Sequence, residues 1–174
     1  MTIAATGALL RVQQALVTHF AEFSAGSTGL VTTLHDFGLA LPSPLPPLLL
    51  YDEPPAGLHT YYRIGNAAID YEAGNAATLW SIDQDLEVYS DPVRGRAQVL
   101  ALADVLERAF LPTDGAEMNF DRDNLRYIDA HGNSAVAPIR VVDMVPTGTT
   151  IGFSSGGLTY QAIVTYNLIV ARID

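Results

Sequence analysis

The sequence contains no cysteine and no lysine. The absence of cysteine excludes disulfides, thiolate catalysis and cysteine-based zinc sites. All nine basic residues are arginine, and nineteen acidic residues give the chain a formal net charge of −10. Affinity for nucleic acid depends mainly on Lys and Arg side chains that neutralise phosphates, so we expect no specific nucleic-acid binding.

The sequence also lacks any apolar run of the roughly 18 to 20 residues that a membrane-spanning helix needs. Its first twenty residues do not show the basic start, apolar middle and small-residue cleavage site of a signal peptide. We therefore expect a cytosolic protein with no membrane partner. A length of 174 residues with 49% hydrophobic side chains suits one domain, over residues 1–174, that buries a real core.

The most informative stretch covers residues 79–111. Over residues 79–90, apolar and polar side chains alternate, which is typical of a strand with one buried face. The apolar set is Trp80, Ile82, Leu86 and Val88, and the polar set is Ser81, Asp83, Asp85 and Glu87. Asp91 and Pro92 then favour a break and the start of a helix, in which apolar residues recur at spacings of three and four. The strand and the helix are predicted to close one apolar layer between them.

Further segments complete the predicted fold. Residues 6–23 have the spacing of an amphipathic helix, on which the lone His19 is expected to be a packed or surface residue rather than a ligand. Residues 61–65 form a short strand, and residues 139–149 and 158–173 predict a long C-terminal hairpin. We predict a single α/β (α+β) domain, in which two helices pack on a mostly antiparallel sheet that ends in this hairpin.

Two segments are irregular. Residues 30–57 form a Pro-rich extension whose six prolines exclude a regular helix or a central strand. Its many leucines favour an extended segment that packs on its own subunit or on a neighbour. Because Pro-rich peptides also bind aromatic grooves, a small binding or adaptor module remains an alternative function. Residues 66–78, rich in Ala, Gly and Asn, indicate an exposed hairpin excursion or a weak strand.

Two patterns suggest chemistry, and neither has the context that the chemistry needs. Residues 152–156 have the spacing of a hydrolase nucleophile elbow, with Ser154 as the nucleophile. A strand is predicted after them instead of a helix, and no histidine lies downstream, so a hairpin loop is favoured over a serine hydrolase. Asp83, Asp85 and Glu87 could hold a hard cation, but no fourth ligand is evident and a solvated sheet face is favoured. We therefore expect no catalytic residue, metal site or cofactor.

Three segments carry a family resemblance. Residues 86–91 end a strand with the pair Tyr89 and Ser90 and lead into an Ala-rich helix over residues 94–106. This arrangement resembles that of the tail terminator (tail completion, head–tail joining) proteins of long-tailed bacteriophages. Residues 61–65 are similar to that family's preceding strand, and residues 160–171 to its last strand. The resemblance implies an α/β subunit without catalytic residues.

The resemblance also implies a structural virion assembly protein that forms a homo-oligomer, a hexameric ring. Such a ring caps the tail tube, ends tail polymerisation and joins the tail to the neck and head. The implied partners are the tail tube protein, the neck or connector proteins and, in a contractile tail, the sheath. The implied location is the tail–neck junction of the virion, after assembly in the host cytoplasm.

Position along the predicted strands suggests which residues form a subunit interface. The acidic side chains on one face of the predicted strand over residues 79–90, which we call the acidic stripe, are expected to meet arginines of a neighbouring subunit, because opposite charges across an interface set its orientation. The stripe is Asp83, Asp85 and Glu87, and the candidate arginines are Arg63, Arg126, Arg140 and Arg172. The last strand is unusually long, and Ile163 and Ile169 on its polar side predict burial on both faces at a subunit boundary.

Overall fold

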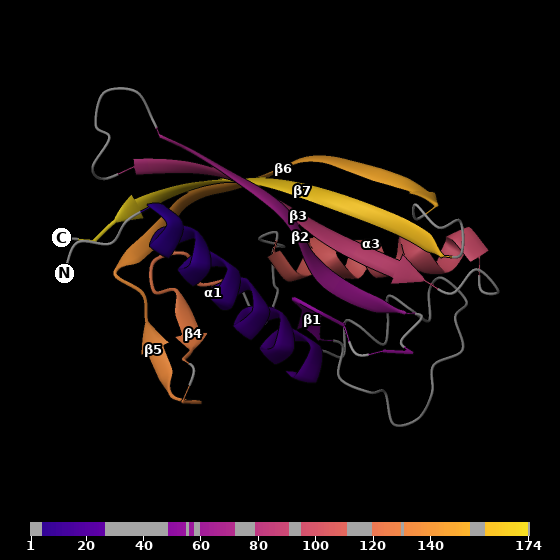
Figure 1. Cartoon of the computed structure of the whole chain (residues 1–174), viewed down its shortest axis with the longest axis horizontal. Helices are drawn as coiled ribbons and strands as arrows, with labels where there is room; N and C mark the ends of the chain where they lie inside the picture. The colour runs from indigo at the N-terminus through magenta and orange to yellow at the C-terminus, as the bar shows by residue number, and fades with distance from the viewer. Residues whose placement is uncertain are drawn as a thin grey trace.

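A computed structural model describes residues 5–26, 49–54, 56–57, 60–71, 79–90, 95–110, 120–129, 131–153 and 159–173. Figure 1 shows the elements in chain order. They are α1 (Ala5–Gly26), β1 (Leu50–Tyr51), β2 (Tyr61–Tyr71), β3 (Leu79–Ser90), α3 (Gly95–Phe110), β4 (Arg126–Ile128), β5 (Ser134–Val136), β6 (Ile139–Phe153) and β7 (Tyr160–Arg172). The predicted combination of two helices with a mostly antiparallel sheet and a C-terminal hairpin is confirmed.

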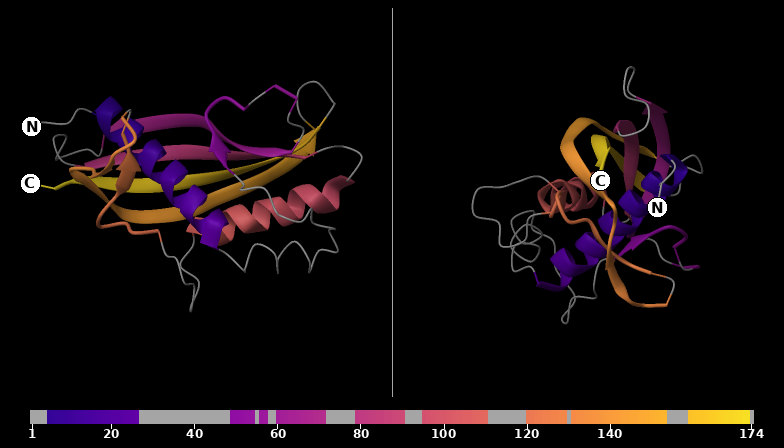
Figure 2. Two further views of the ribbon diagram at one scale, coloured as in Figure 1. Left: turned by 90° about the horizontal axis from the view of Figure 1, so that it is seen from below. Right: turned by 90° about the vertical axis from the view of Figure 1, so that its left-hand side faces the viewer.

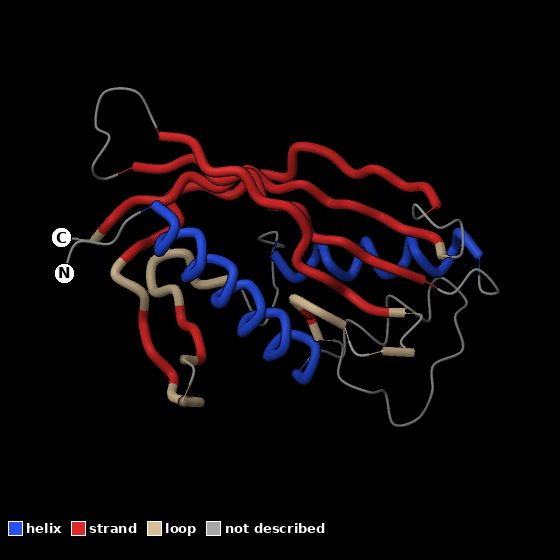
Figure 3. Tube along the Cα trace, viewed as in Figure 1, coloured by secondary structure: helices blue, strands red, loops and turns tan. Residues whose placement is uncertain are grey.

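The main sheet has five strands in the order β1-β2-β3-β7-β6. β1 pairs with β2 in parallel, and every other neighbouring pair is antiparallel. The central strand β3 pairs with β7 along all twelve of its residues, from Leu79 opposite Ala171 to Ser90 opposite Tyr160. In Figure 3 the four long strands run side by side through the molecule.

The alternation predicted for β3 is present on its apolar side. Trp80, Ile82, Leu86 and Val88 are buried in one core cluster with residues of both helices. Figure 2 shows that α1 and α3 lie on the same side of the sheet. We call the side that they cover the inner face of the sheet.

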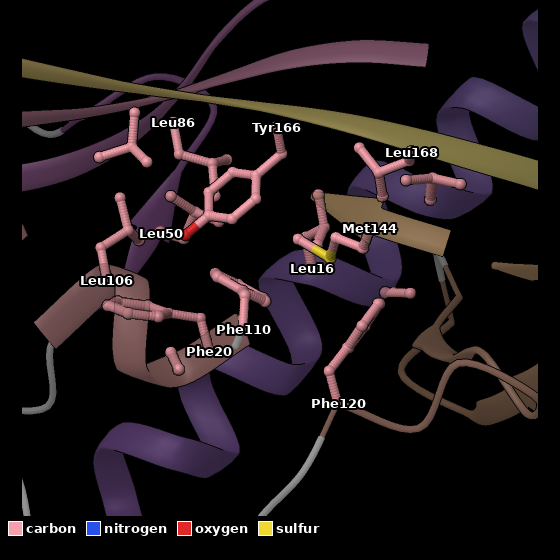
Figure 4. Packing of buried hydrophobic residues seen from close by; sticks show 14 of the residues in the cluster. Leu16, Phe20, Leu50, Leu86, Leu106, Phe110, Phe120, Met144, Tyr166 and Leu168 are labelled. Carbon is pink, nitrogen blue, oxygen red and sulfur yellow. The ribbon is translucent and has the colours of Figure 1, made fainter. Parts of the chain in front are cut away.

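Aromatic rings connect the two helices to this inner face. The ring of Phe20 on α1 meets the rings of Tyr62 and Phe110, at centroid distances of 4.8 and 6.2 Å. Phe110, at the end of α3, meets Tyr166 of β7 at 6.0 Å. Figure 4 shows the rings of Phe20, Phe110 and Tyr166 among the buried leucines. Edge-to-face and stacked contacts of this kind fix the orientation of the helices beyond what burial alone requires.

Two strands extend further than their sequences predict. β6 continues to Phe153, and β2 continues to Tyr71 through the Gly-Asn-Ala-Ala stretch that starts at Gly65. Each is paired with a long neighbouring strand, β2 with β3 and β6 with β7, so pairing overrides the weak strand preference of Gly, Asn and Ala. The ends of β6 and β7 pair at Phe153 and Tyr160, which confirms the C-terminal hairpin.

A second, two-stranded sheet of β4 and β5 does not follow from the sequence pattern, because each strand has only three residues. Its turn is held by Asp129, whose carboxylate accepts the N–H groups of His131 and Asn133, each at 2.8 Å. Gly132 adopts a φ of 80°, which glycine tolerates best. The guanidinium of Arg11 on α1 lies 4.2 Å from the ring of Tyr127, which joins this hairpin to the helix.

Of the Pro-rich extension, the structure describes only a part near its end. Leu50 is buried and Tyr51 continues the short strand β1 at the edge of the main sheet, so this part packs on its own subunit. The remainder up to residue 48, and the predicted break at Asp91 and Pro92, lie outside the described residues.

The helix α3 provides a stability test with a matched control. Leu106 is fully buried in the same cluster as Trp80, so Leu106→Ala should lower the free energy of unfolding by about 2–5 kcal/mol. Leu100 on the same helix is 37% exposed, and Leu100→Ala should cost much less. Chemical denaturation of both variants measures the difference. Equal losses would contradict the placement of α3 on the sheet.

Candidate functional site

The acidic side chains of β3 lie on the face of the sheet that faces away from the helices, which we call the outer face. Among the described residues, no helix covers this face. Asp83 is exposed and Asp85 is partly exposed, but Glu87 is only 3% exposed. The predicted solvated stripe is therefore wrong for Glu87, which is buried by neighbours on β2.

The two aspartates are held by side chains of β7 directly across from them. Asn167 Nδ2 donates to Asp83 Oδ1 at 2.8 Å and to Ser81 Oγ at 3.0 Å. Thr165 Oγ1 donates to Asp85 Oδ1 at 2.7 Å. These hydrogen bonds fix the direction of both carboxylates through one oxygen of each, and the other oxygen of each accepts no hydrogen bond from the described residues.

Glu87 is the centre of a polar cluster that joins three strands. Its Oε2 atom accepts from Arg63 Nε at 2.9 Å, from Arg63 Nη2 at 2.6 Å and from the Tyr89 hydroxyl at 2.6 Å. Gln161 Nε2 donates to the Tyr89 hydroxyl at 2.8 Å. Burial and then the bond to Glu87 raise the pKa of Tyr89, so its hydroxyl stays protonated and donates. The buried carboxylate is paired and hydrogen-bonded, as burial of a charge requires.

The cluster depends on a glycine in β2. A Cβ added at Gly65 would lie 2.6 Å from Glu87 Oε1 and 2.9 Å from its Cδ. Gly65 lies where the β2–β3 register shifts between Ile64 and Ala67, a local irregularity of the bulge type. A residue without a side chain therefore lets β2 pass closely over the Glu87 side chain.

The inner face carries a fully buried polar residue, Gln84, among apolar neighbours. Its Nε2 lies 2.8 Å from the carbonyl oxygen of Asp85 and 3.3 and 3.4 Å from those of Asn66 and Gly65. Its Oε1 accepts from Gln13 Nε2 of α1 at 2.9 Å. Gln84 thus joins the irregular part of β2 to α1. The sequence signal for this role is a glutamine at an inward position of β3, between the apolar inward residues Ile82 and Leu86.

The structure brings most of the predicted interface residues together. Arg63, Ile163 and Ile169 share the outer face with the acidic stripe, with Ile163 opposite Glu87 and Ile169 opposite Ser81. The Arg63 guanidinium pairs with Glu87 of its own subunit. A role of these residues between subunits stays a prediction.

The other three predicted arginines lie away from the acidic stripe. Arg126 is on β4, where its Nη2 lies 3.5 Å from Glu22 Oε1 of α1. Arg140 and Arg172 line a shallow pocket beside Asp123. Their placement also leaves the interface prediction untested.

The described part of the chain does not contain the features that metal binding, membrane insertion or serine hydrolysis would need. No set of three or more His, Asp or Glu there could hold a metal ion. No described helix is long and apolar enough to cross a membrane. Ser154 lies outside the described residues, but the next described element after it is the strand β7, whereas a nucleophile elbow requires a helix.

Comparison with known proteins gives information about the fold. No protein-family model matches the sequence, and a search of curated proteins finds no match. The structure is similar to a chain in the solved "Virion of native gene transfer agent (GTA) particle", with a TM-score of 0.54 and 16% sequence identity. The similarity covers 92% of this chain and 97% of that chain. The two chains therefore share a fold over nearly their whole lengths.

His19 is a packed residue, as predicted. It is buried between α1 and α3, with Nε2 2.6 Å from the carbonyl oxygen of Ala109. Its ring contacts the rings of Phe110 and Phe120 at centroid distances of 5.5 and 5.2 Å. Burial lowers the pKa of His19, and the bond to Ala109 and the nearby charge of Glu22 oppose this effect.

The close approach at Gly65 can be tested by adding one methyl group. Gly65→Ala should lower the free energy of unfolding by about 1–3 kcal/mol, because the new Cβ overlaps a pinned side chain. Gly148→Ala is the control, since nothing lies within 4 Å of its added Cβ. Combining Gly65→Ala with Glu87→Ala should cost less than the sum of the single changes. Strict additivity in urea denaturation would contradict the contact.

The burial of His19 predicts a pH dependence of stability. A histidine with a lowered folded-state pKa contributes stability above its unfolded pKa of about 6.5, and this contribution declines as the pH falls below it. The slope of unfolding free energy against pH, between about pH 5 and 7, should flatten in His19→Gln. The exposed His131 provides the control His131→Gln, which should keep the slope of the unchanged protein. An unchanged slope in His19→Gln would overturn this assignment.

Proposed function

We propose that this chain is a structural virion protein that acts as a tail terminator. In this proposal it forms a hexameric ring that caps the tail tube, ends tail polymerisation and joins the tail to the neck or connector proteins. The observation that carries the proposal is the fold shared with a chain of a gene transfer agent virion over 92% of this chain. The strand-to-helix segment of residues 86–106, which resembles the phage tail terminators, supports the finer assignment.

The outer face supports assembly over catalysis. Its carboxylates are held by hydrogen bonds from β7, and Glu87 is neutralised by Arg63 within the subunit. The face presents partly exposed Ile163 and Ile169 beside these polar groups. A surface of apolar and acidic side chains, with the acidic ones held in place, suits a protein partner, because fixed side chains lose little conformational freedom on binding.

A terminator needs one surface that matches the last ring of the tube and another that a further tube subunit cannot use. In the proposal, Asp83 and Asp85 are part of such a surface, in ring closure or in docking to the tube. Arg63 and Arg126 already pair with Glu87 and Glu22 of the same chain, so the exposed Arg140 is the better candidate partner from a neighbour. Opposite charges across the contact would orient the subunits.

The proposal predicts the phenotype of particles that lack this gene. Their tails should grow to abnormal length and fail to join heads, and the unchanged gene supplied in trans should restore normal particles. Asp83→Arg with Asp85→Arg should fail to restore them while the purified variant keeps its unfolding transition, because like charges at an interface cost more than exposed charges contribute to folding. Electron microscopy of the particles gives the tail lengths.

The control reverses two acidic residues elsewhere. Asp52→Arg with Glu53→Arg changes the net charge by the same amount at exposed positions, and it should restore normal tails. Normal, head-joined tails in particles without the gene would rule out the terminator role. If the two double variants restored normal tails to the same extent, Asp83 and Asp85 would not be part of the assembly surface.

A further inference from the structure

The main sheet has an open edge along the second half of β6. The first half is less suited to pairing, because the N–H of Val141 already donates to the carbonyl oxygen of Arg122 at 2.8 Å and Pro146 has no N–H to offer. From Gly148 to Phe153, no described strand pairs with the edge of β6 that points away from β7. Phe153 is 60% exposed, although it is a large apolar residue.

The opposite side of the sheet is also open over part of its length. β1 pairs only with Tyr62 and Arg63 of β2. Within the described residues, no strand continues from β1 along the edge of Asn66–Asp70 that points away from β3, and most of this segment is exposed. Long open edges are templates for pairing with another chain, and soluble proteins normally protect them with charges or with very short strands.

The two open edges match in direction. β2, β3, β7 and β6 alternate in direction, because each neighbouring pair is antiparallel. β6 of one copy placed beside β2 of a second copy therefore continues the same antiparallel alternation. Of the residues in Gly148–Phe153 and Asn66–Asp70, only Asp70 is ionisable, so copies of this acidic chain can approach here with little charge repulsion.

The two open edges are displaced along the strand direction. Ala68 lies opposite Asp83, Asp83 opposite Asn167, and Asn167 opposite Val145, so Ala68 and Val145 share one row of the sheet. The middle of Gly148–Phe153 lies roughly five residues further along, or about 17 Å. Pairing of the two segments thus staggers each copy against the next, and closed arrangements of strands require such a stagger.

We propose that Gly148–Phe153 of one copy pairs antiparallel with Asn66–Asp70 of the next copy, so that the main sheets join head to tail. The inference rests on the proposed ring and names the contact that closes it. The contact uses two different surfaces, as a ring requires. Pairing of β6 with β6 of a second copy would satisfy only one edge and would stop at a dimer.

The absence of cysteine makes this contact testable by cross-linking. Thr150 and Ala68 are exposed and lie on the same outer face of the sheet, Thr150 opposite Ile163 and Ala68 opposite Asp83. A chain with both Thr150→Cys and Ala68→Cys, treated with a short bismaleimide, should give a ladder of covalent oligomers beyond the dimer on a denaturing gel. Each single-cysteine chain should remain monomeric. The reaction is run on concentrated purified protein and on assembled particles.

Each other outcome is informative. Covalent dimers from Thr150→Cys alone would show β6 paired with β6 and would overturn the inference. Rings seen by native mass measurement without any ladder would overturn it but leave the proposed ring intact. Monomers in solution and no ladder in particles would also overturn the inference, and particles in which electron microscopy shows no ring of this chain would contradict the proposed ring as well.

A charge at the edge gives an independent test. Thr150→Lys should reduce the ring population at least tenfold, because a lysine on an edge strand opposes pairing. Thr6→Lys, the same change at an exposed position on α1, should leave the ring population unchanged. Equal ring populations in the two variants would overturn the inference.

Discussion

The arrangement of the molecule depends on the register of β3 between β2 and β7. A slip by one residue would move every side chain of β3 to the opposite face. Two buried polar residues hold this register from opposite sides of the strand. On the inner face, Gln84 binds the carbonyl oxygens of the irregular part of β2 and accepts from Gln13 of α1. On the outer face, Glu87 fits under Gly65 and binds Arg63 and Tyr89. In a shifted register, neither the carboxamide of Gln84 nor the carboxylate of Glu87 could keep these partners.

This register determines what each face can do. The inner face receives both helices and the aromatic contacts of Phe20 and Phe110, so it supplies the core. The outer face keeps Asp83 and Asp85 in fixed positions. On either side of it, β2 and β6 each have a stretch of edge that no described strand pairs with. The main sheet therefore presents a face of fixed polar side chains that no described helix covers. That division between a covered face and an available one is what the proposed role in a virion requires.

The sequence was sufficient for the parts of the fold that have regular periods. The alternation of β3 and β7 and the spacing in α1 and α3 predicted their positions to within a few residues. The full lengths of β2 and β6 were not predictable, because they depend on pairing with β3 and β7 and not on local preference. The turn at Asp129 and the three-residue strands β4 and β5 were too short to give a period.

The candidate site was predictable only in part. The sequence placed Asp83, Asp85 and Glu87 on one face, but the burial of Glu87 depends on Arg63 and Gly65, which lie more than twenty residues earlier in the chain. Only the strand register brings these residues together. Gln84 could have been noticed as a polar residue at an inward position, although its partners on β2 and α1 could not.

The most direct test of the proposed role is cryo-electron microscopy of the particles made by the cell that encodes this chain. The account predicts six copies in one ring at the head-proximal end of the tail tube, with the sheet of each copy continued by its neighbour. Particles without the chain, or with the chain at a position other than the end of the tube, would contradict it.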